Sequence, residues 1–356
     1  MTGGLSASTV DSLTELASAE LRELETSAGA YLSFERWRDL EQDARWQTRY
    51  VVVRRDTGLL ALLPLSAPAK GAWSFAAYDP RALLGESASG TAERDWLLVG
   101  GRADLACGLL RAPGLDDATL VAAAELAGGA ARADPLAHQR RLAALYVGAD
   151  ERDAIARVLG PAVEERVVGT EARLAVVGNG RGDHLASLSS SHRNVVRRDW
   201  RDRDAAELAT RSTGWEEVID EAAGLIADVS RGHGHADHPV IVRARLEPWL
   251  AHREIEPVAF VVSARERTLA IALGWRWRDL LQVYEVGLVS REVPARHLAY
   301  VEAMVYAPLR WAADRGCREI TLGLAASEPK RLRGAELRPV HAIASTAAIP
   351  ANGERS

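Results

Sequence analysis

Five arginines lie close together in the stretch HRNVVRRDWRDR, residues 192 to 203. A serine at position 190 or 191 would cap a helix here, and on that helix three arginines share one face at i, i+4 and i+8, namely Arg193, Arg197 and Arg201. A row of guanidinium groups can bind the phosphates of tRNA or of a nucleotide-linked acceptor. A solvated charged face, with the two aspartates of the stretch as local partners, explains the pattern equally well.

The stretch LGLAASEPKRLRGAEL, residues 322 to 337, contains an uncommon cation. The chain has 44 lysines and arginines, of which only Lys70 and Lys330 are lysines. Where arginine is the default, a lysine at position 330 indicates a need for a compact ammonium group. Arg331 and Arg333 follow it closely and form a second basic run.

A carboxylate stands inside an otherwise apolar predicted strand, VYEVGL. Glu285 could accept the proton of an attacking nucleophile, and strand alternation predicts that Tyr284 points to the opposite face of the sheet. Both are therefore candidate catalytic residues. A buried ion pair with an arginine would explain the carboxylate equally well.

Three histidines cluster in the stretch RGHGHADHP. The spacing of His233, His235 and His238 occurs in some metal sites, but no carboxylate or cysteine pattern elsewhere in the sequence completes a tetrahedral ligand set. We therefore predict a polar loop between two helices and no metal site.

Length and composition limit the class of protein. At 356 residues the chain is longer than a typical domain with one hydrophobic core, so its length predicts two domains. With 47% hydrophobic residues and a net charge of −5, it has the composition of a soluble globular protein, and its acidity argues against broad nucleic-acid binding without excluding one basic track. No signal peptide or membrane span is expected. Cys107 and Cys317 form neither a CxxC pair nor a disulfide framework, so the sequence predicts a cytoplasmic protein.

Hydrophobic periodicity predicts the order of elements in the first half. Helices over 10 to 27 and 34 to 44 precede a hairpin, RYVVVRR and LLALLPL, joined across DTG. Further strands at WLLVGG, ACGLL, RLAALYV and EARLAVV alternate with a helix from Asp116 and a helix over DERDAIARVL.

The second half begins with a strand, DAAELATR, and continues with helices near 214 to 230 and 240 to 252. Three strands follow, PVAFVVSA, TLAIALGW and LLQVYEVGLV, and then a long amphipathic helix from Arg296 to Arg315. The strand REITLGL, a short helix opened by Ser327 and a strand near 337 to 344 complete the order β-α-α-β-β-β-α-β-α-β.

This order resembles the GNAT acyltransferase fold, and its apparent duplication resembles the Fem-type aminoacyl transferases, which carry two GNAT-like domains in tandem. Three segments are similar to Fem-like sequences: DHLASLSSSHRNVVRRDWRD, YEVGL, and LGLAASEPKRLRGAEL, which looks like their closing K…G element. The resemblance predicts an α/β fold of two tandem GNAT-like domains, each a mixed central sheet flanked by helices. We expect them over residues 1–180 and 181–348, with a flexible tail at 349–356.

The acyl donor that the resemblance implies is aminoacyl-tRNA. Acetyl-CoA-dependent members of the superfamily share a Q/R-x-x-G-x-G/A turn whose backbone amides hold the CoA pyrophosphate. The corresponding junction here, VSREVPARHLAY, has no glycine, and Pro294 lacks a backbone donor. CoA binding through Arg291 and Arg296 is the alternative. Fem-type proteins lack the glycine turn, so we expect no cofactor beyond aminoacyl-tRNA as co-substrate.

The resemblance also implies roles for individual residues. Lys330 matches the lysine of the Fem-like K…G element, to which stabilisation of the tetrahedral oxyanion is attributed, and an ordinary surface lysine is the alternative. The histidine loop borders the substrate cleft in Fem-like proteins, and their first domain binds the acceptor. Besides the arginine row, the predicted substrate contacts are therefore Arg331, Arg333, His233, His235 and Arg81.

These features together predict an acyltransferase that moves an aminoacyl group from aminoacyl-tRNA to an amine, or a hydroxyl, of a cell-wall precursor or specialised metabolite. A CoA-dependent N-acyltransferase is the first alternative, and a non-catalytic binding protein on the same scaffold is the second. The identity of the amino acid, the acceptor and the oligomeric state do not follow from the sequence.

Overall fold

The chain forms two compact units in a computed structural model that describes residues 4–24, 26, 28–69, 76–85, 91–178 and 181–350. The first unit comprises Met1–Gly169 and Pro339–Ser356, and the second comprises Thr170–Arg338. The chain crosses from one unit to the other twice, within β7 (Val163–Ala175) and within β13 (Glu336–Ser345). The domain limits expected from the sequence, 180 and 348, fall just after these two strands.

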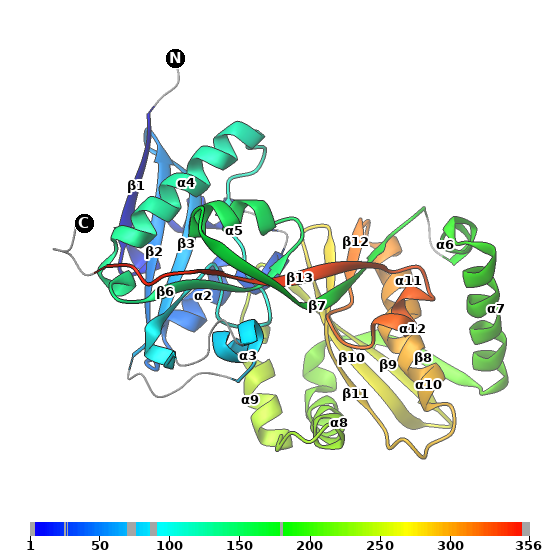
Figure 1. The fold of residues 1–356 in the computed structure, drawn as a ribbon. Helices are drawn as coiled ribbons and strands as arrows, with labels where there is room; N and C mark the ends of the chain where they lie inside the picture. The colour runs from blue at the N-terminus through cyan, green and yellow to red at the C-terminus, as the bar shows by residue number, and fades with distance from the viewer. Residues whose placement is uncertain are drawn as a thin grey trace. The chain divides into compact units, whose positions relative to one another are not determined.

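The first unit has a mixed sheet in the order β1-β2-β3-β4-β6-β13, with β5 paired to β3 (Figure 1). Its other strands are β1 (Leu5–Val10), β2 (Trp46–Arg55), β3 (Gly58–Pro68), β4 (Trp96–Val99), β5 (Leu110–Arg111) and β6 (Arg141–Gly148). Helices α4 (Asp117–Ala133) and α5 (Arg152–Leu159) share one apolar core with the sheet, and α1 (Ser18–Glu23) and α2 (Phe34–Glu41) share another. A fifth helix, α3 (Pro80–Leu84), precedes β4.

The second unit has a mixed sheet in the order β7-β12-β11-β10-β9-β8. Its strands are β8 (Leu208–Thr213), β9 (Glu256–Ala264), β10 (Arg267–Trp277), β11 (Leu280–Leu288) and β12 (Glu319–Thr321), besides β7. Its helices are α6 (Arg181–Ser187), α7 (Ser190–Ala205), α8 (Ile219–Gly232), α9 (Pro239–Leu250), α10 (Arg296–Val301), α11 (Ala307–Asp314) and α12 (Ser327–Arg331).

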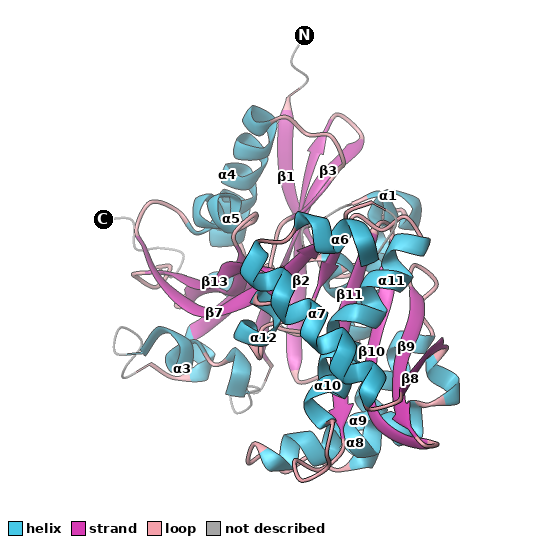
Figure 2. Cartoon of the chain, turned by 90° about the vertical axis from the view of Figure 1, so that its right-hand side faces the viewer, coloured by secondary structure: helices cyan, strands magenta, loops and turns pink. Residues whose placement is uncertain are grey.

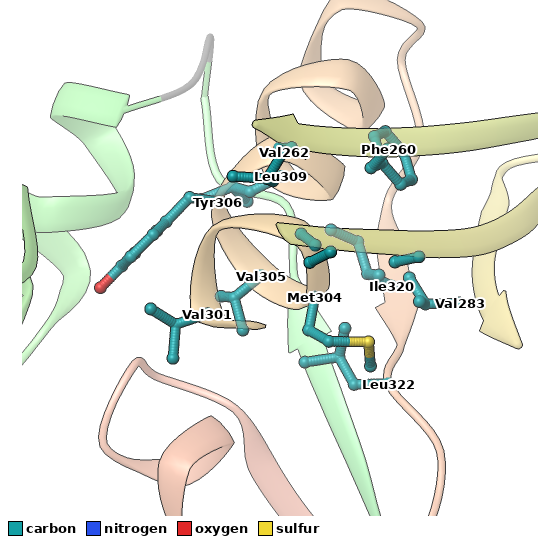
Figure 3. Close-up of a cluster of buried hydrophobic side chains, with 14 of the residues drawn as sticks. Phe260, Val262, Val283, Val301, Met304, Val305, Tyr306, Leu309, Ile320 and Leu322 are labelled. Carbon is teal, nitrogen blue, oxygen red and sulfur yellow. The ribbon is translucent and has the colours of Figure 1, made fainter. Parts of the chain in front are cut away.

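The sheet of the second unit lies between α8 and α9 on one side and α10 and α11 on the other (Figure 1). Met304 and Trp311 share a core with strand residues such as Phe260 and Val283 (Figure 3). On the other face α8 approaches β11 closely at Gly287, where a Cβ atom would lie 2.5 Å from Leu225. The long helix therefore packs on one face and the α8–α9 pair on the other.

Both units share one pairing pattern and exchange their last strands. Going along each sheet, three antiparallel pairs are followed by a parallel pair and a final antiparallel pair. In the first unit the final strand is β13, from the end of the chain, and in the second it is β7, which follows α5. Each half of the sequence thus supplies the strand that completes the sheet of the other unit.

Most predicted elements of the second half are confirmed, including the strands now called β9, β10 and β11 and the short helix that begins at Ser327. The long helix is interrupted by a π-helical segment, Glu302–Tyr306. Pro308 explains the interruption, because it lacks the N–H that an α-helix needs at this position and its ring crowds the preceding turn.

The helix predicted over residues 10 to 27 is confirmed only in part, because the helix described here, α1, covers Ser18–Glu23. Residues 5–10 form β1 on the edge of the sheet, and a capping box between Ser12 and Glu15 closes a short turn before α1. Leu16 and Ala17 have extended backbone, so the α-helix begins only at Ser18. The expected flexible tail also begins too early, because Ile349 exchanges backbone hydrogen bonds with Gln139 and Arg140. Residues 351–356 lie outside the described part of the chain.

No helix in the described ranges is both long enough and apolar enough to cross a membrane.

The exchanged strand β13 makes a testable contribution to the first unit. Ile343 is fully buried in the core that α4 and α5 share with the sheet. We expect Ile343→Ala to lower the free energy of unfolding by about 2–5 kcal/mol, because it removes buried methyl groups and leaves a cavity. Urea titration followed by circular dichroism measures the change. The matched control is Ile241→Ala on α9, where the side chain is 58% exposed and the loss should be within about 0.5 kcal/mol. Equal small losses in both variants would contradict a core role for β13.

Candidate functional site

Lys330 is buried, with only 2% of its surface exposed. Its Nζ donates hydrogen bonds to the backbone carbonyl oxygens of Leu322, Gly323 and Ala325, in the segment between β12 and α12. These three bonds use all three ammonium protons. Burial lowers the pKa of Lys330 to about 8, and the Coulombic attraction of Glu171 opposes this shift only in part. Lys330 is therefore not the ordinary surface lysine of the alternative reading.

The geometry around Lys330 gives a physical reason for lysine at this position. Three carbonyl groups that meet at one point suit a compact ammonium, whereas a planar guanidinium directs its donors along a fork. The backbone of this segment is correspondingly tight, with positive φ angles at Gly323 and Ala326. Gly334 also has a positive φ and lies so close to Leu188 that a Cβ atom would approach it to 2.5 Å. The K…G element is thus a compact structural unit.

Glu285 is paired with Arg245 of α9, whose Nη2 lies 2.8 Å from Oε1 and 2.9 Å from Oε2. This is the ion pair that the sequence offered as the alternative to a proton acceptor. The position of Tyr284 corrects the expected strand alternation. The β10–β11 register shifts here, because Leu273 pairs with Glu285 and Gly274 pairs with Val283, which leaves Tyr284 as the extra residue of a β-bulge.

The bulge turns Tyr284 and Glu285 toward the same helix. The Tyr284 ring lies 4.9 Å from Trp275 and 5.8 Å from Trp249 of α9, measured between ring centroids, and Trp249 and Trp275 are stacked at 4.1 Å. Within the described residues no hydrogen bond or ion pair links Lys330 to either of them. Lys330 makes its direct contacts with the segment before α12, and Glu285 makes its contact with Arg245.

The helix predicted over 190 to 203 is confirmed as α7, and its cap is Ser189, which accepts a hydrogen bond from the backbone N–H of His192. Arg197 and Arg201 are exposed, and no hydrogen bond or ion pair of their side chains occurs in the described part of the chain. Arg193 is half-buried and donates to the backbone oxygen of Leu188 at 2.8 Å. Of the three predicted arginines, Arg197 and Arg201 are therefore without a partner in the described residues, and Arg193 is hydrogen-bonded to the turn that precedes α7.

Arg333 is half of a buried ion pair, so the structure commits it to a contact within the protein. It is 2% exposed, and its Nε and Nη2 donate to Oδ2 of Asp199 at 2.8 and 2.7 Å. The hydroxyl of Tyr306 donates to the same oxygen at 2.6 Å, and Figure 3 shows its ring extending away from the apolar cluster. Asp199 is therefore not the local partner of the arginine row, because it faces the interior.

The remaining predicted contacts are each paired with a neighbouring residue or exposed. Arg331 forms an exposed pair with Glu328 one turn earlier on α12, and Arg81 pairs with Asp79, the residue that caps α3. His233 and His235 are exposed in the α8–α9 loop. In the described ranges no three His, Cys, Asp or Glu side chains are grouped as a metal site requires.

The sequence did not predict the buried polar contacts of the π-helical segment. The fully buried carboxylate of Glu302 accepts a hydrogen bond from Thr210, and Arg203 and Arg310 lie beside it as ion-pair partners. Asp199 and Arg203, four residues apart on α7, thus face Tyr306 and Glu302, four residues apart on the segment. The sequence feature that could have indicated a break in this helix is Pro308, which lies inside the predicted helix.

No family model matches the sequence, and no curated protein sequence matches it. Solved structures do resemble the fold. FemX aligns over 94% of this chain and 96% of its own, with 10% sequence identity and a TM-score of 0.61. A conserved protein of unknown function from Bacteroides thetaiotaomicron aligns over 94% and 98%, with 11% identity and a TM-score of 0.51. A tandem GNAT protein from the clavulanic acid biosynthesis pathway is similar at 14% identity, with a looser TM-score of 0.47.

The two units repeat one strand-pairing pattern, and the fold is similar to that of FemX over nearly the whole of both chains, as the Fem-like resemblance predicted. At these identities the similarity establishes the fold and leaves the activity to be argued from the site.

The free arginines of α7 predict an anion-binding surface. If they contact phosphates, Arg197→Gln and Arg201→Gln should each weaken RNA binding severalfold and reduce the salt dependence of its affinity, since fewer counterions are released. Fluorescence anisotropy with labelled tRNA at several salt concentrations measures both effects. Melting temperatures should hardly change, because exposed charges contribute little to stability.

Two controls accompany this test. Arg211→Gln, on β8, removes an exposed arginine of the same unit that is not on α7 and pairs with Glu217, and it should leave RNA affinity unchanged. Arg333→Gln breaks a buried ion pair and should lower the free energy of unfolding by about 3–5 kcal/mol. An equal loss of RNA affinity in Arg211→Gln would argue against a surface specific to α7.

Lys330 predicts a pH dependence of stability. Its pKa is lowered from the usual 10.5 to about 8 in the folded chain, so between these values the unfolded chain binds this proton more tightly. Its contribution to the free energy of unfolding therefore rises with pH, by on the order of 1–2 kcal/mol between about pH 8 and pH 9.5. Urea unfolding of the protein and of Lys330→Met at both pH values isolates this term. A parallel pH response of the two proteins would contradict it.

Proposed function

We propose that this chain is an acyltransferase that moves an aminoacyl group from aminoacyl-tRNA to an amine, or less readily a hydroxyl, of a cell-wall precursor or specialised metabolite. The proposal joins the tandem GNAT fold, in its Fem-like arrangement, to the chemistry of the second unit. Aminoacyl transfer needs no nucleophile from the enzyme, because the ester is already activated and the acceptor supplies the attacking amine or hydroxyl. What it needs is a held donor and a stabilised tetrahedral oxyanion.

The observation that carries the choice of donor is the junction between β11 and α10. Two of its backbone donors bond within the junction, since the N–H groups of Val293 and Arg296 donate to the backbone oxygens of Ser290 and Val293 at 3.1 and 3.3 Å. Pro294 contributes no N–H, and the Nε of Arg296 donates to the backbone oxygen of Val289 at 2.8 Å. Three positions that could present an amide to a CoA pyrophosphate, Val293, Pro294 and Arg296, are therefore unavailable, and the Nε of Arg296 is already engaged. This favours a donor other than CoA.

The unpaired arginines of α7 supply what a tRNA donor needs. Arg197 and Arg201 lie one helical turn apart on an exposed face of a chain whose net charge is negative. A local track of this kind binds phosphates while the remaining surface repels them. It therefore suits one docked nucleic acid, not coating of the chain by RNA.

Within this proposal Lys330 is the candidate oxyanion donor. Its three protons are held by carbonyl groups before the reaction, so an oxyanion would have to replace one of these weak neutral acceptors. A negatively charged acceptor is the stronger partner of an ammonium, which makes the exchange favourable as charge develops. An alternative within the proposal is that Lys330 only shapes the segment before α12.

The donor can be tested directly. Incubation of the purified chain with a pool of charged tRNA and candidate acceptor amines should consume aminoacyl-tRNA, and RNase treatment should abolish product. A panel of acyl-CoAs under the same conditions should give no transfer. Calorimetry should find CoA binding in the millimolar range or weaker, equivalent to about 4 kcal/mol or less. Micromolar CoA binding with CoA-dependent transfer would overturn the proposal in favour of a CoA-dependent N-acyltransferase.

Substitution of Lys330 separates its two possible roles. If the ammonium stabilises the oxyanion, Lys330→Met should lower kcat by about 100-fold or more with KM nearly unchanged, because the oxyanion exists only beyond the ground state. Lys330→Arg should restore only part of the activity, since its fork cannot reproduce the ammonium geometry. A raised KM with near-normal kcat in Lys330→Met would instead mean that the residue shapes the site without touching the reacting atoms.

A further inference from the structure

The sheet of the first unit ends at a strand whose outer side is open. Strand β1 pairs with β2 through all six of its residues and without a shift of register, and no strand in the described part of the chain pairs with its other side (Figure 1). In an edge strand the N–H and C=O groups of alternate residues point away from the sheet, where they can pair with another chain. Strand β1 is therefore a regular strand with an unpaired backbone edge.

The sequence of β1 lacks the features that usually prevent an edge strand from pairing. Its residues, LSASTV, include no charged side chain and no proline, both of which commonly protect an edge. Strand β8, the edge strand of the second unit, is also six residues long, but its sequence LATRST contains the exposed Arg211. A symmetric contact between two copies of β8 would bring two arginines together, whereas a symmetric contact between two copies of β1 brings no like charges together.

Charged side chains beside β1 are paired within the chain. On β2, Nη1 of Arg54 lies 3.1 Å from the carboxylate of Glu20, and Nε of Arg49 lies 2.7 Å from the carboxylate of Asp11, the residue that follows β1. These pairs compensate the charges next to the open edge. A strongly charged partner therefore gains little there, and an uncharged strand is the partner that the edge fits.

The two faces of β1 differ in polarity. Ala7 packs against the core that α4 and α5 share with the sheet, whereas Ser6 and Ser8 point to the other face and are exposed. Helix α4 lies against β1 on the apolar face (Figure 2). A strand added at this edge must present small or apolar side chains on the side of α4 and polar ones on the other side. A second copy of β1 has this alternation already.

We propose that β1 is the surface through which two copies of this chain associate, by antiparallel pairing of their β1 strands about a two-fold axis perpendicular to the sheet. Directly opposite residues of an antiparallel pair share a face, so the residue on the axis must pair with its own copy. Ala7 and Ser8 are the two axis positions that give the longest overlap of the strands. Both copies of α4 then lie on the same side of the joined sheet. This inference goes beyond the proposed function and does not depend on the acyl donor.

Sedimentation velocity tests the association. The full chain, at a series of micromolar concentrations, should form a species of twice the 38.5 kDa chain mass, in a fraction that rises with concentration. Ser8→Lys should raise the dissociation constant of the dimer by about tenfold or more, because the symmetry places two ammonium groups close together. The matched control is Ser212→Lys, at an exposed position of β8, which should leave the dissociation constant unchanged. Circular dichroism checks that both variants are folded.

Cysteine cross-linking tests which edge is used. Both native cysteines, Cys107 and Cys317, are buried, so introduced surface thiols react selectively. In Ser6→Cys/Ser8→Cys, position 6 of one copy faces position 8 of the other when Ala7 is on the axis, and position 8 faces its own copy when Ser8 is. Opposite Cβ atoms lie about 4.5–5.5 Å apart, close to the spacing that a disulfide needs. Mild oxidation should therefore give a covalent dimer on a non-reducing gel, and Ser212→Cys should not at the same concentration.

Three results would rule out the β1 interface. The first is a chain that stays monomeric at every concentration. The second is a dimer that Ser8→Lys does not weaken, or that Ser8→Lys and Ser212→Lys weaken equally. The third is a dimer in which Ser6→Cys/Ser8→Cys gives no more covalent product than Ser212→Cys. A dimer weakened by Ser8→Lys alone and cross-linked through positions 6 and 8 would establish β1 as the contact between copies.

Discussion

The second unit depends on one buried carboxylate. Asp199 accepts hydrogen bonds from Arg333, beyond α12, and from Tyr306, in the π-helical segment. It thereby connects α7 to two later segments of the chain, which follow Asp199 by 107 and 134 residues in sequence. A buried charge needs a charged or hydrogen-bonded partner. That requirement sets the rotation of α7 and fixes the end of the K…G element, so it also determines which cations remain available at the surface.

The pairing of charges divides the basic residues into two groups with different roles. Arg333 and Arg193, expected as ligand contacts, are committed to the protein itself, and Lys330 is surrounded by backbone carbonyls. Arg197 and Arg198 are committed to nothing in the described chain. A cation that already has hydrogen-bond partners gains little free energy from binding a ligand, because it must first lose a bond. A cation without partners gains a full charge-assisted hydrogen bond. The second group therefore carries the argument for an anionic partner.

Sequence patterns predicted the elements that follow from local periodicity and missed those that depend on distant contacts. Alternation identified β9, β10 and β11, and Ser327 marked the start of α12. The bulge at Tyr284 could not be predicted from the sequence, because it depends on the register between β11 and β10. It places Tyr284 and Glu285 on the same side of the sheet, where alternation predicted opposite sides. The ion pair between Arg333 and Asp199 could not be predicted either, because a run of basic residues does not show which of its side chains is buried. The cap at Ser189 was misplaced by one residue, the usual uncertainty of a helix end.

The exchange of final strands affects how the chain can be made. The first unit contains residues near the start of the sequence, yet its sheet needs β13, and Leu142 bonds to Ser345 across 203 residues. During synthesis the edge of β6 that pairs with β13 therefore stays unpaired until the whole second unit has emerged from the ribosome. An unpaired apolar strand edge is the kind of surface that other chains recognise and that chaperones shield. Expression of this protein should accordingly be limited less by the stability of the finished fold than by the protection of one strand during translation.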